Sequence, residues 1–271
     1  MRTVIHLSDL HFGRIDSAIL EPLVKFIGEA RPDLVAVSGD LTQRARTAEF
    51  LAAKDFLAAI PFPQIVVPGN HDVPLHNLFA RFIRKLDRFT RYITADLQPA
   101  FIDSEIAVVG VNTARSFTWK DGRINASQLE QLRATLKDVP EERTKIVVTH
   151  HPFDLPEGAA GNVVGRSRLA MATLAECGVD LLLAGHFHIA HTGQTAKRYK
   201  MPGYSAIIVS SGTSTSTRGR GQPNSFNVIR IDRPNVEIER RTWEPASGTF
   251  DLLSIERFHT AGGGWVRDEH E

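Results

Sequence analysis

The sequence predicts an α/β fold in which helices connect parallel strands. Short apolar runs of strand length alternate with longer stretches that carry apolar residues at helical spacing. This strand–helix–strand order implies parallel pairs with right-handed crossovers. The 271 residues are enough for one large α/β domain or two small ones, and we find no internal repeat or linker that would divide them. We therefore expect a single domain over residues 1–260 and a flexible glycine-rich tail over residues 261–271.

Three buried strands and two helices are predicted at the amino-terminal end. Each strand is an apolar run closed by polar residues or by a Gly or Pro turn. Each helix carries apolar residues on one face, which predicts packing against the sheet. The elements in chain order are a strand at Thr3–Ser8, a helix at Asp16–Ala30, a strand at Leu34–Val37, a helix at Thr47–Ala59 and a strand at Ile65–Val67.

Further helices and strands are predicted along the rest of the chain. His76–Thr90 has helical spacing and a basic face, for which we expect a solvated surface, with a lid over a site as the alternative. The last four strands are expected to form a meander. The elements are two strands within Phe101–Val111, a helix at Ser127–Leu136, a strand at Lys145–Thr149, a helix at Arg168–Cys177, a strand at Val179–Ala184, and the meander Ser205–Ser211, Ser225–Ile231, Val236–Trp243 and Leu252–His259.

Composition excludes several classes of protein. The net charge of +1 gives no global field for nucleic acid or acidic membrane, although a local basic patch is not excluded. The single cysteine, Cys177, excludes an intramolecular disulfide and a cysteine-based zinc site. No stretch approaches the roughly 20 apolar residues of a transmembrane segment, and the N-terminus runs into a strand without a leader. We therefore expect a cytoplasmic protein.

Polar residues follow five of the predicted strands directly. The stretch Val66-Val67-Pro68-Gly69 leads into Asn70, His71 and Asp72, which folding alone does not require. Open α/β sheets place their sites at the carboxyl ends of strands. If the backbone is extended there, residues i and i+2 point the same way, so Asp9 and His11 face one point, and at most one of two adjacent histidines does. The five groups are Asp9/His11, Asp40, Asn70/His71, His150 and His186/His188.

These residue types indicate a centre with two metal ions. Imidazole, carboxylate and amide ligands without thiolate suit Mn, Fe, Zn or Co better than Ca or Mg. Seven protein ligands are too many for one reactive metal but suit two divalent metal ions bridged by a carboxylate. Such a centre keeps a positive charge that attracts a phosphate oxyanion. The chemistry that we expect is phosphoester hydrolysis by attack of a metal-bridging hydroxide.

The order of the motifs resembles the calcineurin-like metallophosphoesterase superfamily. The matching residues are Asp9–His11, Gly39-Asp40, Gly69–Asp72, His150–Pro152 and Gly185–His188. The resemblance implies a four-layer αββα sandwich with the dimetal site at one edge. It also implies Asp9, His11, Asp40 and His188 as ligands of one metal and Asp40, Asn70, His150 and His186 as ligands of the other. His71 resembles the histidine that contacts the phosphate and helps the leaving group, and Asp72 could hold the His71 ring or raise its pKa.

Departures from the pattern point to one branch of that superfamily. Serine/threonine phosphatases carry Asp-Arg-Gly after the Gly-Asp motif, where this chain has Leu41-Thr42-Gln43-Arg44. Its size, its Gly-Asn-His-Asp motif and the run from Gly212 to Arg220 are similar to the class III cyclic-nucleotide phosphodiesterases of bacteria. That resemblance implies a phosphodiesterase acting on cyclic nucleotides or similar small diesters. Arg218 and Arg220 are candidate substrate contacts, with a solvated loop as the alternative.

Two other functions remain open from the sequence. One is a different phosphoester hydrolase of the superfamily, such as a nuclease or a lipid-linked phosphoester or diphosphate hydrolase. The near-neutral net charge argues against nucleic acid as the partner. The other is a metal-binding module without turnover, against which the complete ligand set and His71 argue. The sequence favours a small-molecule diester as substrate and leaves open the native metals and whether the chain forms a homo-oligomer.

Overall fold

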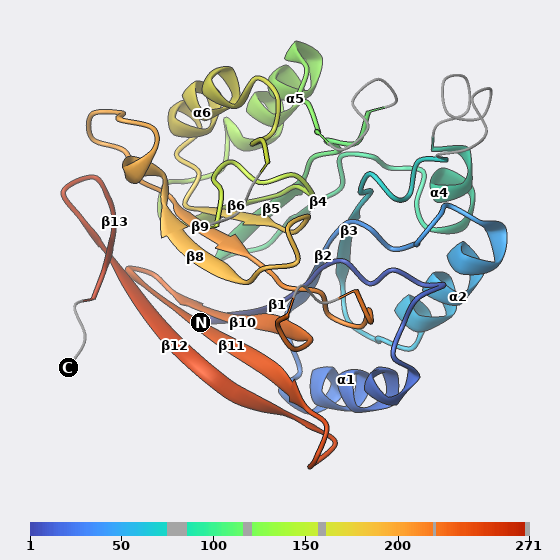
Figure 1. Ribbon diagram of the computed structural model, residues 1–271. Coiled ribbons are helices and arrows are strands. Elements are labelled where there is room, and N and C mark those ends of the chain that lie inside the picture. The colour runs from blue at the N-terminus through green and yellow to red at the C-terminus, as the bar shows by residue number, and fades with distance from the viewer. Residues whose placement is uncertain (75–85, 116–120, 157–160, 219–220, 269–271) are drawn as a thin grey trace.

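The computed structural model describes residues 1–74, 86–115, 121–156, 161–218 and 221–268. Its elements form four layers, with two sheets packed face to face and helices on both outer sides (Figure 1). This arrangement confirms the αββα sandwich. Most of the predicted helix at His76–Thr90 lies outside the described residues. Its last part is described and belongs to helix α4 (Asp87–Tyr92).

The first sheet has seven strands and includes the three strands predicted at the amino-terminal end. The strand order is β13-β12-β11-β10-β1-β2-β3, with β1, β2 and β3 parallel and the others antiparallel. Helices α1 (Ser17–Ala30) and α2 (Thr47–Ala58) connect the parallel strands. The strands are β1 (Arg2–Leu7), β2 (Leu34–Ser38), β3 (Gln64–Val67), β10 (Ser225–Asp232), β11 (Asn235–Glu244), β12 (Thr249–Ala261) and β13 (Gly264–Arg267).

The second sheet has six strands in the order β4-β5-β6-β7-β9-β8. Strands β5, β6, β7 and β9 are parallel, and α5 (Ala126–Leu136) and α6 (Ser167–Glu176) cover the outer face. A short 3-10 helix, η1 (Thr195–Lys197), follows β8. The strands are β4 (Ala100–Ile102), β5 (Ile106–Gly110), β6 (Thr144–Val148), β7 (Leu181–Ala184), β8 (His191–Gln194) and β9 (Ile207–Ser210).

Three apolar cores fill the three interfaces between the four layers. Alternate residues of one strand enter different cores: Ile5 of β1 packs under α1 and α2, whereas Val4 faces the second sheet. In the second sheet, Val148 faces the first sheet and Val147 packs under α5 and α6. Burial on both faces explains why these strands are apolar runs without alternation.

Helix α1 begins where the sequence predicts. Asp16 is its N-cap, and its carboxylate accepts a hydrogen bond of 3.0 Å from the backbone N–H of Ala18. Such caps satisfy backbone donors that have no partner within the helix. The cap fixes the point at which the chain turns from the loop after β1 into α1.

Two expectations about the carboxyl-terminal part are wrong. The predicted meander is wrong in its first strand, because β9 pairs in parallel with β7 in the second sheet; the meander consists of β10, β11, β12 and β13. The segment from residue 261 is not wholly a tail either. Residues 264–267 form β13, which pairs with β12 and buries Trp265, whose indole N–H donates to Asp180 (2.8 Å). The buried indole anchors a segment whose glycines suggested mobility.

Candidate metal centre

The seven predicted ligands lie together at one edge of the sandwich. They follow the carboxyl ends of β1, β2 and β3 in the first sheet and of β6 and β7 in the second. The parallel strands within each sheet place these ends side by side. The site therefore lies at the seam between the two sheets. The ligands are Asp9, His11, Asp40, Asn70, His150, His186 and His188.

The backbone at the site is left-handed, not extended as the i, i+2 argument assumed. Strand β1 ends at Leu7 and β7 at Ala184, before their polar residues begin. A non-glycine residue with this conformation costs about 1–3 kcal/mol and requires support from its surroundings. Five ligands have φ angles of 51–77°: Asp9, His11, Asp40, His186 and His188. The side chains converge through these turns, while Leu10 between the first pair is buried in the apolar core.

The first predicted ligand group is compact and buried. The ligand atoms of Asp9, His11, Asp40 and His188 lie within 4.8 Å of one another. His188 Nε2 is 3.3 Å from both Asp9 Oδ1 and His11 Nε2. His11 Nε2 is 3.8 Å from Asp40 Oδ2. Two imidazole nitrogens and two carboxylate oxygens therefore face one point.

The second predicted ligand group shares Asp40 with the first. His150 Nε2 lies 3.5 Å from Asp40 Oδ1 and 3.0 Å from Asn70 Oδ1. His186 Nδ1 lies 2.9 Å from the same amide oxygen and 3.2 Å from His150 Nε2. His150 Nδ1 donates to the Ser38 carbonyl (2.8 Å), so in the neutral ring the lone pair is on Nε2. A lone pair directed at two oxygens is the arrangement that a cation stabilises.

An orphaned oxygen in the first group also fits a cation. Asp9 Oδ2 accepts hydrogen bonds from the Ser8 hydroxyl (2.7 Å) and the His186 backbone N–H (3.0 Å). Asp9 Oδ1 is buried, and among the described residues no donor with hydrogen-bonding geometry reaches it. Burial opposes the charge on this carboxyl group, but the imidazoles of His188 and His11 outweigh it and hold the pKa well below its usual range. A buried anion with one uncompensated oxygen is suited to a metal.

Burial favours the neutral form of two of the predicted histidine ligands, whereas the Asp40 and Asp9 carboxylates outweigh burial at His150 and raise its pKa. Burial lowers the pKa of His186 to about 3 and lowers that of His188 as well. For Asp40, burial opposes ionisation, but the facing imidazole of His150 contributes most to a net lowering of its pKa. The two groups therefore combine imidazole nitrogens with two ionised carboxylates. Imidazole, carboxylate and amide donors without thiolate suit divalent metal ions.

Glycines allow the ligand loops to approach one another closely. A β-carbon at Gly69 would lie 2.1 Å from Asp40 Oδ1 and 2.3 Å from Asp40 N. At Gly185 it would lie 1.8 Å from Ser8 Oγ and 2.4 Å from Asp9 Oδ2. Neither position has room for any other residue. These glycines let the backbone of one loop contact the carboxylate of another.

His71 and Asp72 do not contact each other as the sequence argument supposed. The His71 Nδ1–H donates to the Gln43 carbonyl (2.8 Å), which fixes the ring. The Asp72 carboxylate instead accepts from Thr42 N (2.9 Å), Gly69 N (2.9 Å) and Leu41 N (3.2 Å). Burial raises the pKa of Asp72 to about 6. The expectation that Asp72 holds the His71 ring is therefore wrong, and Asp72 ties together the two loops that follow β2 and β3.

Sequence reasoning missed His151. Its ring centroid is 4.6 Å from that of His186, and its Nδ1 is 2.7 Å from Thr113 Oγ1. A nitrogen of His151 also lies within 4.8 Å of the ligand atoms of His150 and His186. The expectation that only one of the adjacent histidines faces the site is therefore wrong. Pairing of His-His with a distant Thr is a tertiary contact that no local spacing indicates.

The two candidate substrate arginines have different outcomes. Arg218 lies at the site, where its Nη1 is 3.0 Å from His71 Nε2. Arg220 lies outside the described residues. The structure thus places one arginine beside the predicted phosphate-contacting histidine.

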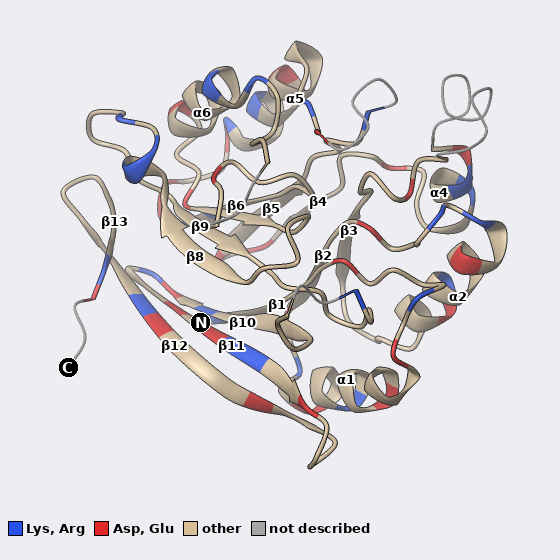
Figure 2. Cartoon of the chain, in the orientation of Figure 1, with Lys and Arg blue, Asp and Glu red and all other residues tan. Residues whose placement is uncertain are grey.

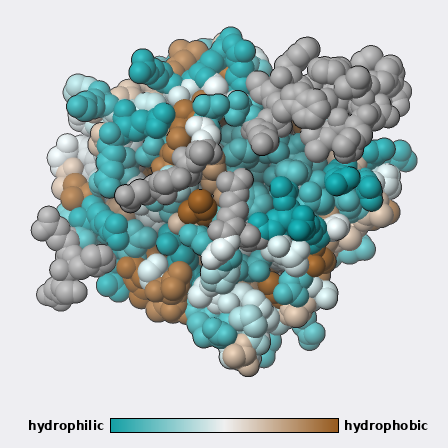
Figure 3. All heavy atoms as spheres, in the orientation of Figure 1, coloured by the Kyte–Doolittle hydropathy of each residue, from teal (hydrophilic) through white to brown (hydrophobic). Residues whose placement is uncertain are grey.

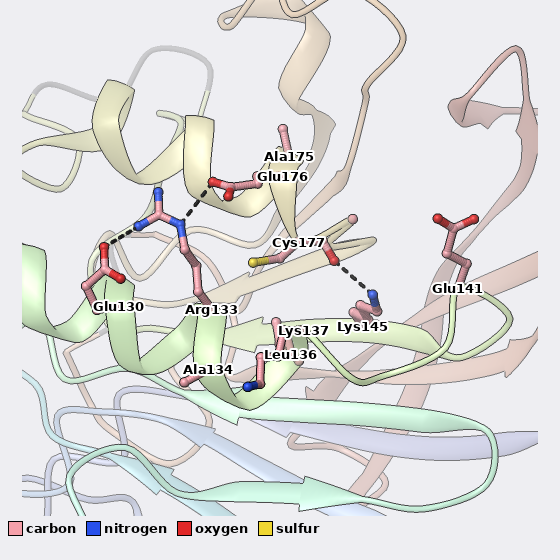
Figure 4. A pocket seen from close by; sticks show the side chains of 11 residues that line it. Glu130, Arg133, Ala134, Leu136, Lys137, Glu141, Lys145, Ala175, Glu176 and Cys177 are labelled. Atoms are coloured by element: carbon pink, nitrogen blue, oxygen red, sulfur yellow. Dashed lines mark hydrogen bonds and ion pairs between the residues drawn. The ribbon is translucent and has the colours of Figure 1, made fainter.

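A hollow of about 590 Å³ between α5 and α6 lies away from this centre (Figure 4). Several of its polar groups are paired. Arg133 contacts Glu130 and Glu176, and Lys145 donates to the carbonyl of Cys177 (2.9 Å). Cys177 is partly buried against the apolar core. We assign no function to this hollow.

The described part of the surface in these views (Figure 2, Figure 3) mixes acidic, basic and apolar residues. Figure 2 shows acidic and basic residues interspersed along β11 and β12. The face seen in Figure 3 is mainly hydrophilic where it is described, with apolar areas that are small and separate. Among the described residues, no helix has the length and apolar character needed to cross a membrane.

Comparisons with known proteins give relatives at low identity. The chain is 26% identical to the glycerophosphodiester phosphodiesterase GpdQ of Enterobacter lignolyticus over 68% of this chain and 69% of that protein. It is 28% identical to the 3′,5′-cyclic adenosine monophosphate phosphodiesterase CpdA of Escherichia coli K12 over 58% of this chain and 54% of that protein. The chain thus spans about half the length of the second relative.

Solved structures show that the fold is shared more widely. Purple acid phosphatase PPD1 from yellow lupin superposes with a TM-score of 0.71 at 15% identity, covering 94% of this chain and 53% of that one. GAP50, the anchor in the inner membrane complex of Plasmodium, gives 0.62 at 15% identity, covering 96% and 89%. Proteins with different roles therefore share the fold, so function must be argued from the site.

A model of one family covers the part of the chain that carries all seven predicted ligands. The calcineurin-like phosphoesterase model matches residues 2–190, which include the strand-end residues from Asp9 to His188. The fold, the five ligand-bearing strand ends and this match agree, and the chain belongs to the calcineurin-like phosphoesterase family.

Proposed function

We propose that this protein is a dimetal phosphodiesterase that hydrolyses small diesters such as cyclic nucleotides. The observation that supports this most is the pair of four-residue donor groups that share Asp40. When bound, two divalent cations at these groups supply a nucleophile from water near neutral pH and neutralise charge on the phosphoryl group. Relatives named as phosphodiesterases of glycerophosphodiesters and of cyclic AMP support a small diester as the substrate class.

The protein's own residues have distinct tasks in this proposal. Asp40 holds both donor groups together, because its two oxygens face His11 and His150 separately. Because burial lowers the pKa values of His186 and His188, these two rings bind a metal without competition from protons. His71 lies edge-on to His11, with 4.9 Å between the ring centroids, and is not a member of either donor group. We assign it to the leaving-group side of the substrate.

The alternatives receive less support. The net charge of +1 argues against a nucleic acid, and acidic and basic residues are interspersed along the described strands β11 and β12 (Figure 2). A metal-binding module without turnover has no need of a histidine outside the donor groups, fixed by Gln43 and directed at Arg218. The cytoplasmic location, the metal identities and self-association stay predictions.

A substrate panel with the Mn²⁺-loaded protein tests the proposal. The panel contains 3′,5′- and 2′,3′-cyclic nucleotides, glycerophosphodiesters, phospholipid-derived diesters, nucleic acid and bis(4-nitrophenyl) phosphate. We expect turnover of small diesters by the native protein and by Asp55→Asn, an exposed carboxylate on α2, and no turnover by Asp9→Asn. Cleavage of nucleic acid or lipid in preference to small diesters would overturn the substrate class. If the protein binds two metals but hydrolyses no diester, the proposal that it is an enzyme is wrong.

A further inference from the structure

Four buried hydroxyl residues fasten the loop that carries Asp9 and His11. Thr213, Ser214, Thr215 and Ser216 are each at most 1% exposed, and we call them the hydroxyl clasp. The clasp lies between β9 and β10, outside residues 2–190 of the family match. Buried hydroxyls in succession are unusual unless each has a hydrogen-bond partner.

The partners of the clasp are backbone carbonyl groups of the ligand loop, three of them consecutive. Thr213 Oγ1 donates to the Asp9 carbonyl and Thr215 Oγ1 to the Leu10 carbonyl, both at 2.7 Å. Ser214 N–H donates to the Ser8 carbonyl (2.9 Å), and Ser216 Oγ donates to the Arg14 carbonyl (3.0 Å). These contacts support the left-handed conformation of Asp9 and His11.

The clasp leads directly to Arg218 and fixes its backbone. The Arg218 N–H donates to Ser216 Oγ (3.1 Å), so a buried hydroxyl fixes the backbone of the arginine. Its Nη1 then lies 3.0 Å from His71 Nε2. Since His71 packs edge-on against the ligand His11, the guanidinium lies one ring away from the first donor group. A permanent cation is thus held beside the residue assigned to the leaving-group side.

We propose that Arg218 is a catalytic residue that binds a non-bridging oxygen of the substrate phosphoryl group, and that the clasp positions it. This inference rests on the proposed phosphodiesterase function. A guanidinium is planar, stays charged and suits phosphate geometry. Arg218 makes and breaks no covalent bond in this role. Its N–H groups exchange one hydrogen-bond acceptor, His71 Nε2, for the incoming phosphoryl oxygen. The clasp residues act through Arg218 and the ligand loop, so they are positioning residues.

Binding of inorganic phosphate to the Mn²⁺-loaded protein tests the role of Arg218 without requiring turnover. We expect Arg218→Ala to weaken the calorimetric Kd by about 10- to 100-fold, the usual value of a charge-assisted hydrogen bond, with two metals retained. Arg218→Lys should recover part of the loss. Arg44→Ala removes an equal charge from an exposed position next to Gln43 and should leave the Kd unchanged. An unchanged Kd in Arg218→Ala would overturn the role.

The hydrogen bond itself is tested in the metal-free protein. In the structure, His71 Nδ1 carries the proton and Nε2 accepts from Arg218, so ¹⁵N shifts should report a protonated Nδ1 and an unprotonated Nε2. Arg218→Ala should move the Nε2 signal. If the His71 Nε2 signal does not move in Arg218→Ala, the hydrogen bond between the two side chains is absent and the inference is wrong.

Clasp variants separate positioning from simple stability. Thr215→Val removes the hydroxyl and keeps the shape; we expect weaker phosphate binding and the same His71 Nε2 shift as in Arg218→Ala. Thr215→Ser should restore both, and Thr249→Val, at an exposed position of β12, should alter neither. A lower Tm with native phosphate affinity and native His71 signals would assign the clasp to stability alone. A native protein that hydrolyses no diester would instead overturn the proposed function.

Discussion

Replacing Gly69 with alanine tests how closely the site holds Asp40. The added β-carbon would lie 2.1 Å from Asp40 Oδ1, 2.3 Å from Asp40 N and 2.8 Å from Asp40 Cγ. Since non-bonded heavy atoms normally stay more than about 3 Å apart, the carboxylate or the 69–72 turn must move by about 1 Å. A displacement of about 1 Å in a catalytic arrangement costs on the order of 100-fold in rate.

The effect should reach both donor groups, because Asp40 faces His11 and His150 at once. We expect kcat/KM for bis(4-nitrophenyl) phosphate to fall by about 100-fold, with weaker retention of both metals after dialysis. The control is Gly28→Ala at an exposed position of α1, where nothing lies within 4 Å of the new β-carbon. That variant should keep full activity and gain stability, by about 0.5–1 kcal/mol. Gly69→Ala with native activity and two retained metals would refute the argument.

Four further variants test single contacts. Asp40→Ala should abolish activity and deplete both metals, whereas His188→Ala should deplete mainly one; metal analysis that finds two ions in Asp40→Ala would remove it as the shared ligand. His71→Ala should slow an alkyl or cyclic-nucleotide diester by about 10²–10⁴-fold and a nitrophenyl diester much less, with both metals bound; equal losses on both substrates would contradict a leaving-group role. Asp72→Ala removes the acceptor of three backbone N–H groups and should lower the unfolding free energy by at least about 2 kcal/mol, measured by denaturant unfolding; native stability would exclude its structural role.

The fold class and the ligand positions could be predicted because both depend on local pattern. Strands such as β2, which lie between two cores, must be apolar on both faces, and polar residues directly after them mark the sheet edge. Helix α1 follows from its N-cap and its apolar face. These signals are carried by neighbouring residues, so the sequence alone contains them.

What the sequence could not give depends on contacts between distant segments. Asp9 and His11 were predicted to face one point because the backbone was assumed to be extended. Both residues instead have left-handed φ angles, which no local sequence pattern indicates here. Likewise, the sheet to which β9 belongs is decided by its pairing with β7. The C-terminal segment is ordered by Trp265, which reaches Asp180 of the other sheet. In each case a tertiary contact overrides the local expectation.

The position of the site at the seam of the sandwich explains why its geometry cannot belong to either sheet alone. His150 follows a strand of the second sheet, yet its ring is fixed by the Ser38 carbonyl at the end of β2 in the first. In the reverse direction, the backbone of His186 holds Asp9, which follows β1. Each sheet therefore orients ligands of the other. The core between the sheets sets the spacing of both donor groups, and the clasp adds the loop between β9 and β10 to the same seam.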